Sequence, residues 1–319
     1  MPRLAAIPAA TAGAPTMTEQ VAAADGAAER KVVVTAVLLM LLAGFSSSLL
    51  HLGVRYVGPE LPSIEIVFLR ALFTLIATAP FVFRPGKAAW RSNNLTLQVM
   101  RGVVGVGSMW MWYYALANMP LADAGVLSFT TPIFITIGAA LYFREPVGLV
   151  RGSAVVLGLL GAVVVLKPGY AVVSAAAIAA VVSSVLWALS LLMAKDLARF
   201  DSSITISFYQ PLLIAPIAGL AVIPVWVMPS GSAWLALVAM GAVAALGNYA
   251  YIHALRMTDA STLMPADYVR LLWMVMWGYF VFSEIPGLST WLGAALIVGS
   301  TFYVTWRETR LAPKRRAPK

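Results

Sequence analysis

The sequence predicts an all-α integral membrane protein whose ten transmembrane helices form two inverted five-helix repeats around a central cavity. Hydrophobic residues make up 61% of the chain and charged residues 11%, against about 45–50% and about 25% in soluble domains. The mean hydropathy is +0.86. Continuous apolar runs near the ~20 residues of a membrane span recur along the chain, and the second half repeats the first. A bilayer, rather than one soluble core, must therefore solvate this apolar surface.

Composition also excludes several kinds of function. The chain has 319 residues and a net charge of +9, but most Lys and Arg residues lie between apolar runs, where membrane topology explains them better than nucleic-acid binding does. It has no cysteine and two histidines, and it lacks the spacings typical of metal or nucleotide sites. We expect no cofactor, no metal and no nucleic-acid partner. A membrane enzyme would need clustered catalytic groups on long loops, and none is evident.

Ten apolar segments account for most of the chain. The first repeat should span 32–166 and the second 172–306, between a disordered cytoplasmic tail at 1–29 and a basic cytoplasmic tail at 307–319. Translation starts either at Met1 or at Met17. The segments are 32–54, 63–83, 97–118, 121–142, 149–166, 172–194, 203–226, 232–255, 260–283 and 288–306.

Basic residues predict the orientation of these segments. With the N-terminus inside, the inner connections and tails carry seventeen Lys and Arg residues, whereas the outer turns carry two. Positive residues accumulate in cytoplasmic loops. The sequence therefore predicts an inner-membrane protein with both termini in the cytoplasm.

An internal repeat underlies the inverted topology. A shift of 139 residues places Gly102 on Gly241 and Glu145 on Glu284. Five helices is an odd number, so the second repeat must begin on the opposite side of the membrane. Inverted repeats of this kind are typical of transporters, whose substrate sites lie near the bilayer midplane between the halves.

Aromatic residues are the first candidates for a substrate site. Many membrane Trp and Tyr residues instead form interfacial belts, but several of these share helix faces with polar residues. Arg270, Trp273 and Trp277, for example, follow the spacing of one helix face. The aromatic candidates for substrate binding are Trp110, Tyr113, Trp187, Tyr249, Tyr268, Trp273 and Trp277.

Charged residues inside the segments are the second set. Arg270 lies near the middle of the ninth segment, with Asp267 three residues before it. Because intramembrane charge is costly, this pair should face the protein interior. It is either a structural ion pair or a site where Arg270 binds an anionic substrate group. Arg70 in the second segment is a further candidate for substrate binding.

Histidine, proline and glycine complete the candidates. His51 or Asp267 could couple transport to protons, although a hydrogen-bonded structural role is the simpler interpretation of His51. Pro132, Pro211 and Pro265 could act as hinges or only as kinks. Glycines in the fifth and tenth segments should allow close helix packing, within a monomer or between the protomers of a homodimer.

Three stretches carry a resemblance to a known family. They are "FLRALFTL" in the second segment, "YYALANMPLADAGVLSFTTPIF" across the third and fourth, and "FREPVGLVRGSAVVLGLLGAVVV" leading into the fifth. They resemble the EamA type of the drug/metabolite transporter superfamily over roughly 35–305. The Trp-rich third and ninth segments are similar to those of aromatic amino-acid exporters of the YddG kind. In the second repeat the position of Pro132 is taken by Leu271, so specificity should lie where the halves differ.

The resemblance implies ten helices in two inverted repeats and transport of a small metabolite. We therefore expect an exporter of small amphipathic metabolites, foremost amino acids including aromatic ones, that works by alternating access in contact with membrane lipid. An exporter of cationic drugs or other metabolites is one alternative, and a non-transport scaffold or lipid scramblase is another.

Overall fold

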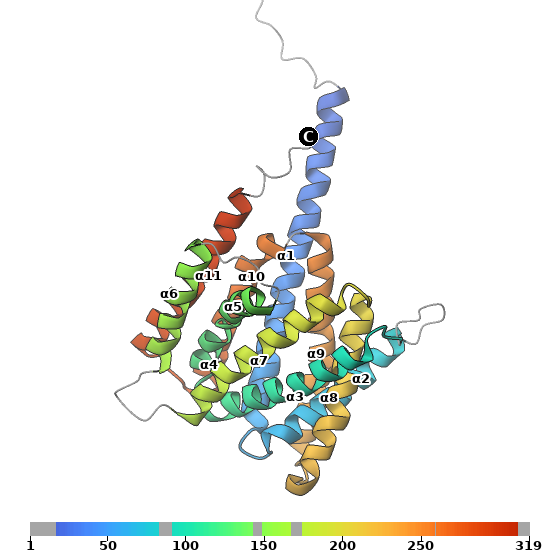
Figure 1. Ribbon diagram of the computed structural model, residues 1–319, viewed down its shortest axis with the longest axis vertical. Coiled ribbons are helices and arrows are strands. Elements are labelled where there is room, and N and C mark those ends of the chain that lie inside the picture. Colours follow the sequence, from blue (N-terminus) through green and yellow to red (C-terminus); the bar gives the residue numbers. More distant parts are fainter. Residues whose placement is uncertain (1–16, 83–90, 143–148, 167–173, 259, 312–319) are drawn as a thin grey trace, which may run out of the picture.

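Helices make up almost the whole of the described chain in the computed structural model, which covers 17–82, 91–142, 149–166, 174–258 and 260–311 (Figure 1). No strand occurs in these ranges. The helices, including the short 3₁₀ helix η1, are α1 (Met17–Val57), α2 (Ser63–Val82), α3 (Leu95–Asn118), α4 (Leu121–Ser128), α5 (Thr131–Tyr142), α6 (Leu149–Leu166), α7 (Ala175–Leu197), α8 (Ser203–Val222), η1 (Ile223–Val225), α9 (Gly231–Met257), α10 (Ala260–Phe282) and α11 (Leu288–Leu311).

Each helix lies where an apolar segment was predicted, with one segment divided. Five stretches in the described ranges are long and apolar enough to cross a membrane: Lys31–Val57, Leu121–Leu141, Ala175–Leu197, Thr205–Val225 and Gly231–Tyr251. The count of ten spans stays a prediction. Residues 1–16, 312–319 and Glu145 lie outside the described ranges.

The first helix begins earlier than the predicted segment. α1 starts at Met17 rather than near 32, so residues 17–29, expected in a disordered tail, lie in the helix. The stretch from 22 to 28 is rich in Ala, the residue with the highest helix propensity. Figure 1 shows this part of α1 extending beyond the other helices.

Side-chain caps fix the start of several helices. The Asn94 side chain accepts a hydrogen bond from the Leu97 amide at the start of α3. Ser174, Ser202 and Ser230 make the equivalent bond at the starts of α7, α8 and α9. Each cap satisfies an amide that has no partner within its own helix.

The predicted fourth segment is divided into α4 and α5. The amides of Phe129 and Thr130 bond back three residues, to Val126 and Leu127, rather than four. Pro132 follows directly, and because it has no amide hydrogen it cannot continue the α-helical ladder. The break places Phe129 inside the bundle, where it is 3% exposed.

Contacts between the two five-helix halves occur in equivalent pairs: when a helix of the first half packs on one of the second, the corresponding helices pack with the halves reversed. α1 packs on α9, and α7, the first helix of the second half, packs on α3. In the same way α2 contacts α9 while α8 contacts α3. Two further pairs, α2 with α8 and α6 with α11, join equivalent helices, and α6 and α11 lie side by side at one edge in Figure 1.

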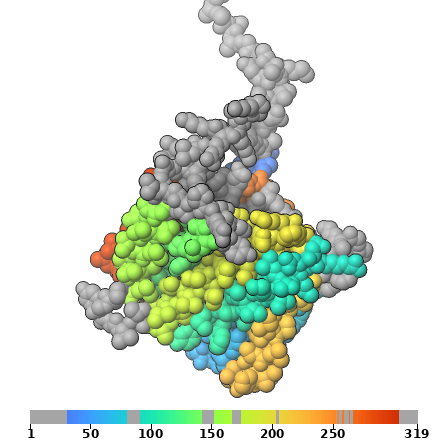
Figure 2. All heavy atoms as spheres, viewed as in Figure 1, coloured from blue at the N-terminus to red at the C-terminus, as the bar shows by residue number. Residues whose placement is uncertain are grey.

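Apolar surface covers the outside of the bundle. α7 and α3 cross the middle of the face in Figure 2, with α6 along one edge and α8 along another. Large apolar side chains on these helices are exposed, including Val103, Leu157, Val182 and Leu220. Lipid tails are the solvent that such a surface requires.

The α6–α11 pair yields the first prediction. A Cβ atom at Gly293 would lie 2.9 Å from the Gly161 carbonyl oxygen and 2.2 Å from Val165 Cγ2, whereas one at Gly299 meets nothing within 4 Å. Gly293→Ala should therefore destabilise the protein by about 1–3 kcal/mol, as overpacking does. Gly299→Ala, on the same helix, should not. Thermal unfolding in detergent measures both, and equal midpoints for the two variants would contradict this packing.

Candidate functional site

α1 and α10 come together along one face near the middle of the bundle. A Cβ atom at Gly44 would be 3.5 Å from Arg270 Cβ, so glycine allows the arginine to pass close to α1. Further along, the Phe45 ring meets Trp273 edge-on at 5.3 Å between centroids, and Trp277 at 6.0 Å. Trp277 Nε1 donates a hydrogen bond to Ser48 Oγ at 3.1 Å.

The break between α4 and α5 brings a second aromatic group to this face. The guanidinium carbon of Arg270 lies 5.0 Å from the centroid of the Phe129 ring, a cation–π contact. Phe129 also contacts Tyr268, with 5.3 Å between ring centroids. Asp267 Oδ2 is 3.9 Å from Arg270 Nη2, so the predicted ion pair forms, at the long end of the range.

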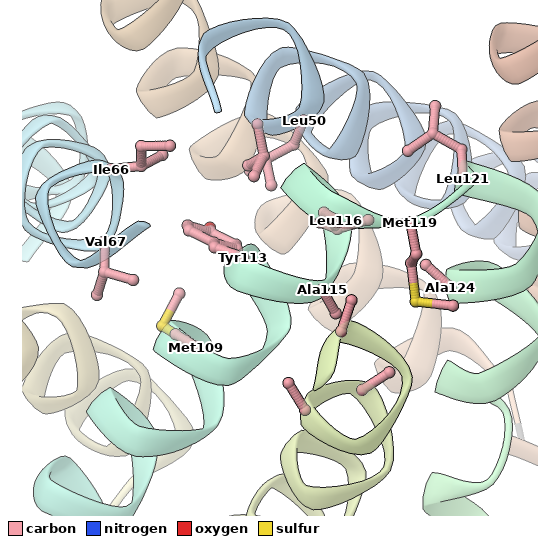
Figure 3. Close-up of a cluster of buried hydrophobic side chains, with 14 of the residues drawn as sticks. Leu50, Ile66, Val67, Met109, Tyr113, Ala115, Leu116, Met119, Leu121 and Ala124 are labelled. Carbon is pink, nitrogen blue, oxygen red and sulfur yellow. The ribbon is translucent and has the colours of Figure 1, made fainter. Parts of the chain in front are cut away.

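Polar residues of α1, α2 and α3 continue the site along α1. Trp112 Nε1 donates to His51 Nε2 at 3.2 Å, and the two rings meet edge-on. Arg70 Nη1 donates to the Tyr113 hydroxyl at 2.7 Å. Figure 3 shows Tyr113 pointing from α3 towards Leu50 of α1 and Ile66 and Val67 of α2, in an otherwise apolar surrounding.

These residues form one group around α1, which we call the seam cluster. It joins helices of the first half, α1 to α4, with α10 of the second half. Only about two helical turns, or about 10 Å, separate Gly44 from His51 along α1. The cluster consists of Phe45, Ser48, His51, Arg70, Trp112, Tyr113, Phe129, Asp267, Tyr268, Arg270, Trp273 and Trp277.

Carboxylates join the two halves at the end of the bundle where α1 meets α2. Glu284, after α10, accepts the Leu121 amide at 2.8 Å and Arg55 Nη2 at 3.1 Å. Arg55 Nη1 also donates to the Ala117 carbonyl oxygen at 2.5 Å. In the same region Glu60 and Glu65 accept the amides of Ser230 and Val227, and Asp123 bonds to Thr290. These contacts close that end of the bundle.

The opposite end has its own polar contacts. Asp201, in the turn between α7 and α8, accepts the Asn93 amide at 2.7 Å, Gln98 Nε2 at 3.0 Å and the Ser92 hydroxyl. Arg101 is buried in α3 and donates to the carbonyl oxygens of Ser190 and Ile206 and to Gln210 Oε1. The helix packing around α3, α7 and α8 depends on these two residues.

A surface cavity lies away from the seam cluster. It holds about 250 Å³ between α6 and α11 and is lined by residues such as Ser153, Leu157, Leu296 and Tyr303. Its lining has no charged residue and opens beside the lipid-facing surface. The seam cluster, with its half-buried charges and aromatic rings, is the better candidate for a specific site.

Comparison with known proteins decides the family. The model of the EamA-like transporter family matches the chain twice, over 34–167 and 174–306. The chain belongs to the EamA-like transporter family. This family lies in the drug/metabolite transporter superfamily, so the sequence-based recognition is confirmed, and the protein is a transporter rather than an enzyme.

Individual EamA relatives cover nearly the whole chain. A riboflavin transporter of Vibrio cholerae is 32% identical over 88% of this chain and 95% of its own. An S-adenosylmethionine uptake transporter of Rickettsia felis is 29% identical over 89% of this chain and 97% of its own. A solved crystal structure shares the fold, with a TM-score of 0.57 at 20% identity over 89% of this chain and 99% of that one.

Within this EamA chain, the structure brings together only some of the predicted site residues. Tyr113, Tyr268, Arg270, Trp273, Trp277, Arg70, His51 and Asp267 all lie in the seam cluster. By contrast Trp110 is 43% exposed on α3, and Tyr249 is 64% exposed on α9, where it stacks on His253. Trp187 is half-buried on α7. These three lie outside the seam cluster.

The proline candidates fall in different settings. Pro132 adjoins the break between α4 and α5, whereas Pro211 lies within a continuous α8. Position 265 lies within α10. Their action as hinges stays a prediction.

Sequence reasoning missed four members of the seam cluster, Phe45, Ser48, Trp112 and Phe129. Ser48 and His51 share one face of α1 with Gly44, at helical spacings of four and three residues. That small and polar face within an apolar helix was the available signal. The sequence offered no such signal for Phe129, because the position of this residue depends on the break between α4 and α5.

Asp201 yields a pH prediction. Burial alone would raise the pKa of its carboxyl, but hydrogen bonds from Asn93, Ser92 and Gln98 outweigh burial and hold the pKa below its usual value. A carboxyl with a depressed pKa stabilises the fold above its unfolded pKa of about 3.9 and loses that contribution as the pH falls through the lower, folded value. Asp201→Asn should therefore lower the unfolding temperature at pH 7.

The difference between wild type and Asp201→Asn should shrink as the pH falls below about 4. Thermal unfolding in detergent across a pH series measures it. Asp196→Asn is a matched control, since this aspartate at the end of α7 pairs with its exposed helix neighbour Arg199, at 3.5 Å. A difference for Asp201→Asn that does not change with pH would contradict the account.

Proposed function

We propose that this transporter carries a small, flat aromatic metabolite across the cell inner membrane by alternating access, and that the seam cluster binds it. The supporting observation is the combination of the buried Phe129 with the half-buried Phe45, Trp273 and Arg270 in one group between the two halves. Aromatic side chains bind flat apolar rings, and a guanidinium orients a polar substituent.

Riboflavin is the first candidate substrate. The relative from Vibrio cholerae, 32% identical, bears that name, and a flavin has a flat ring system that two or three aromatic side chains can enclose. An aromatic amino acid is the second candidate. Arg270 favours it, because a guanidinium next to an aromatic ring can bind a carboxylate while the ring stacks on the substrate side chain.

The alternatives from the sequence have less support. A cationic drug would need an unpaired acid, whereas Asp267 lies 3.9 Å from Arg270. A scaffold or scramblase would not need an aromatic and charged group buried between the halves. We further propose that both termini are cytoplasmic, from the distribution of basic residues, and that the usual direction is export.

Counterflow in liposomes tests this function. Protein reconstituted into vesicles preloaded with unlabelled riboflavin or tryptophan should accumulate the same labelled compound, whichever direction prevails in the cell. Trp273→Ala should reduce the rate by at least about tenfold, as the loss of an aromatic anchor does. An imposed proton gradient shows in the same assay whether protons are coupled to transport.

Trp291→Ala is the matched control. Trp291 lies on α11 and is 49% exposed, so its loss should leave the rate near that of wild type. Equal rates for Trp273→Ala and wild type, with a compound that is exchanged, would rule out the seam cluster as the binding site.

A further inference from the structure

Four buried nitrogen atoms in the seam cluster have no hydrogen-bond partner among the residues that the structure describes. They are His51 Nδ1, Arg70 Nε, Arg270 Nε and Trp273 Nε1. α1, which carries His51, packs on α10, which carries Arg270 and Trp273. Arg70 of α2 reaches the cluster through its bond to Tyr113 of α3, and α3 packs on α1. A buried polar group without a partner costs about 1–3 kcal/mol, and lipid-embedded helices offer no bulk water to remove that cost. Four in one cluster therefore point to a ligand that supplies the partners.

Three of the four nitrogens are donors by their chemistry alone. An arginine Nε and an indole Nε1 each carry a hydrogen and have no lone pair to offer. Arg70 and Arg270 use their terminal nitrogens elsewhere, on Tyr113 and towards Asp267, which leaves each Nε–H free. Trp273 meets Phe45 through its ring, and its N–H stays free.

The fourth nitrogen, His51 Nδ1, is a donor because of Trp112. The Trp112 indole can only donate, so the hydrogen bond to His51 Nε2 requires a lone pair on that atom. A neutral imidazole with a lone pair on one nitrogen carries its hydrogen on the other. If the His51 imidazole were rotated by half a turn, Nδ1 would accept from Trp112 and Nε2 would carry the free N–H. The Trp112 bond thus presents an N–H from His51 to the cluster.

Acceptors and negative charge are scarce in the same place. Ser48 Oγ accepts from Trp277, and the Asp267 carboxylate is close to Arg270. Tyr268 adds one buried hydroxyl, which can donate as well as accept. The seam cluster therefore combines two guanidinium groups with one carboxylate and four free N–H donors.

We propose that the seam cluster is a donor-only binding site, which selects flat ligands that bring several hydrogen-bond acceptors and have no net positive charge. A heterocycle with ring carbonyl and imine nitrogens meets this description, as does an aromatic ring with a carboxylate. A sulfonium or ammonium cation does not, because it would face two guanidinium groups. The inference rests on the proposed function and narrows its substrate class.

Two pairs of compounds test this selectivity by thermal shift of the purified full chain. Tryptophan and tryptamine share the indole ring, but tryptamine lacks the carboxylate and is a cation. Riboflavin is neutral and rich in acceptors, whereas S-adenosylmethionine is a sulfonium cation. Riboflavin or tryptophan should raise the unfolding temperature, and the two cations should bind at least about tenfold more weakly, as expected for a desolvated like-charge contact.

Histidine variants test the donor role of His51. His51→Phe keeps a flat ring but removes the N–H, so it should weaken binding of the stabilising compound by about tenfold, the effect of losing one buried hydrogen bond. His253→Phe is the matched control, since His253 is exposed on α9 and stacks on Tyr249 outside the seam cluster. It should leave binding unchanged.

The outcomes separate this inference from the proposed function. Counterflow of S-adenosylmethionine or tryptamine that Trp273→Ala abolishes would keep the seam cluster as a transport site and overturn its donor-only character. Equal binding of tryptophan and tryptamine, or no effect of His51→Phe, would overturn it as well. So would a lack of stabilisation by both riboflavin and tryptophan.

Discussion

A polar group buried among apolar helices must find its hydrogen-bond partner within the protein or in a ligand, and the arrangement of this bundle follows from that constraint. At one end Glu284 accepts from the Leu121 amide and from Arg55, which joins the second half to the first. At the other end, carbonyl oxygens and Gln210 satisfy Arg101. Hydrogen bonds between the halves therefore hold both ends, although Glu65 Oε1 and Gln98 Oε1 have no partner there among the described residues.

Between these ends, a group of buried polar atoms lacks hydrogen-bond partners in the described protein. The seam cluster gathers Arg70, Arg270, Trp273 and His51 from three helices, and each retains an N–H without a protein partner. The tilted contact of Phe129 with Tyr268, together with the edge-on contact of Phe45 with Trp273, places flat apolar surfaces beside these donors. Rings and donors in one group suit a flat, acceptor-rich solute better than a lipid tail.

Much of the fold could be predicted from the sequence, because apolar length and turn residues set helix positions in a membrane protein. The helices lie at the predicted segments, and Pro132 explains the one division, at Phe129 and Thr130. Helix rotation was harder to predict, because both faces of a lipid-exposed helix are apolar. Trp110 and Tyr113 looked equally suited to the site, yet Trp110 is 43% and Tyr113 only 1% exposed. Phe45 and Phe129 join the cluster through contacts between distant helices, which no local pattern encodes.

The structure of the protein bound to a compound that it transports tests the central claim most directly. The account predicts that the ring of the compound lies within stacking distance of Trp273 or Phe129, with its acceptors on His51 Nδ1 and on the Nε atoms of Arg70 or Arg270. Density for the compound in the cavity between α6 and α11, with the seam cluster unchanged, would contradict it.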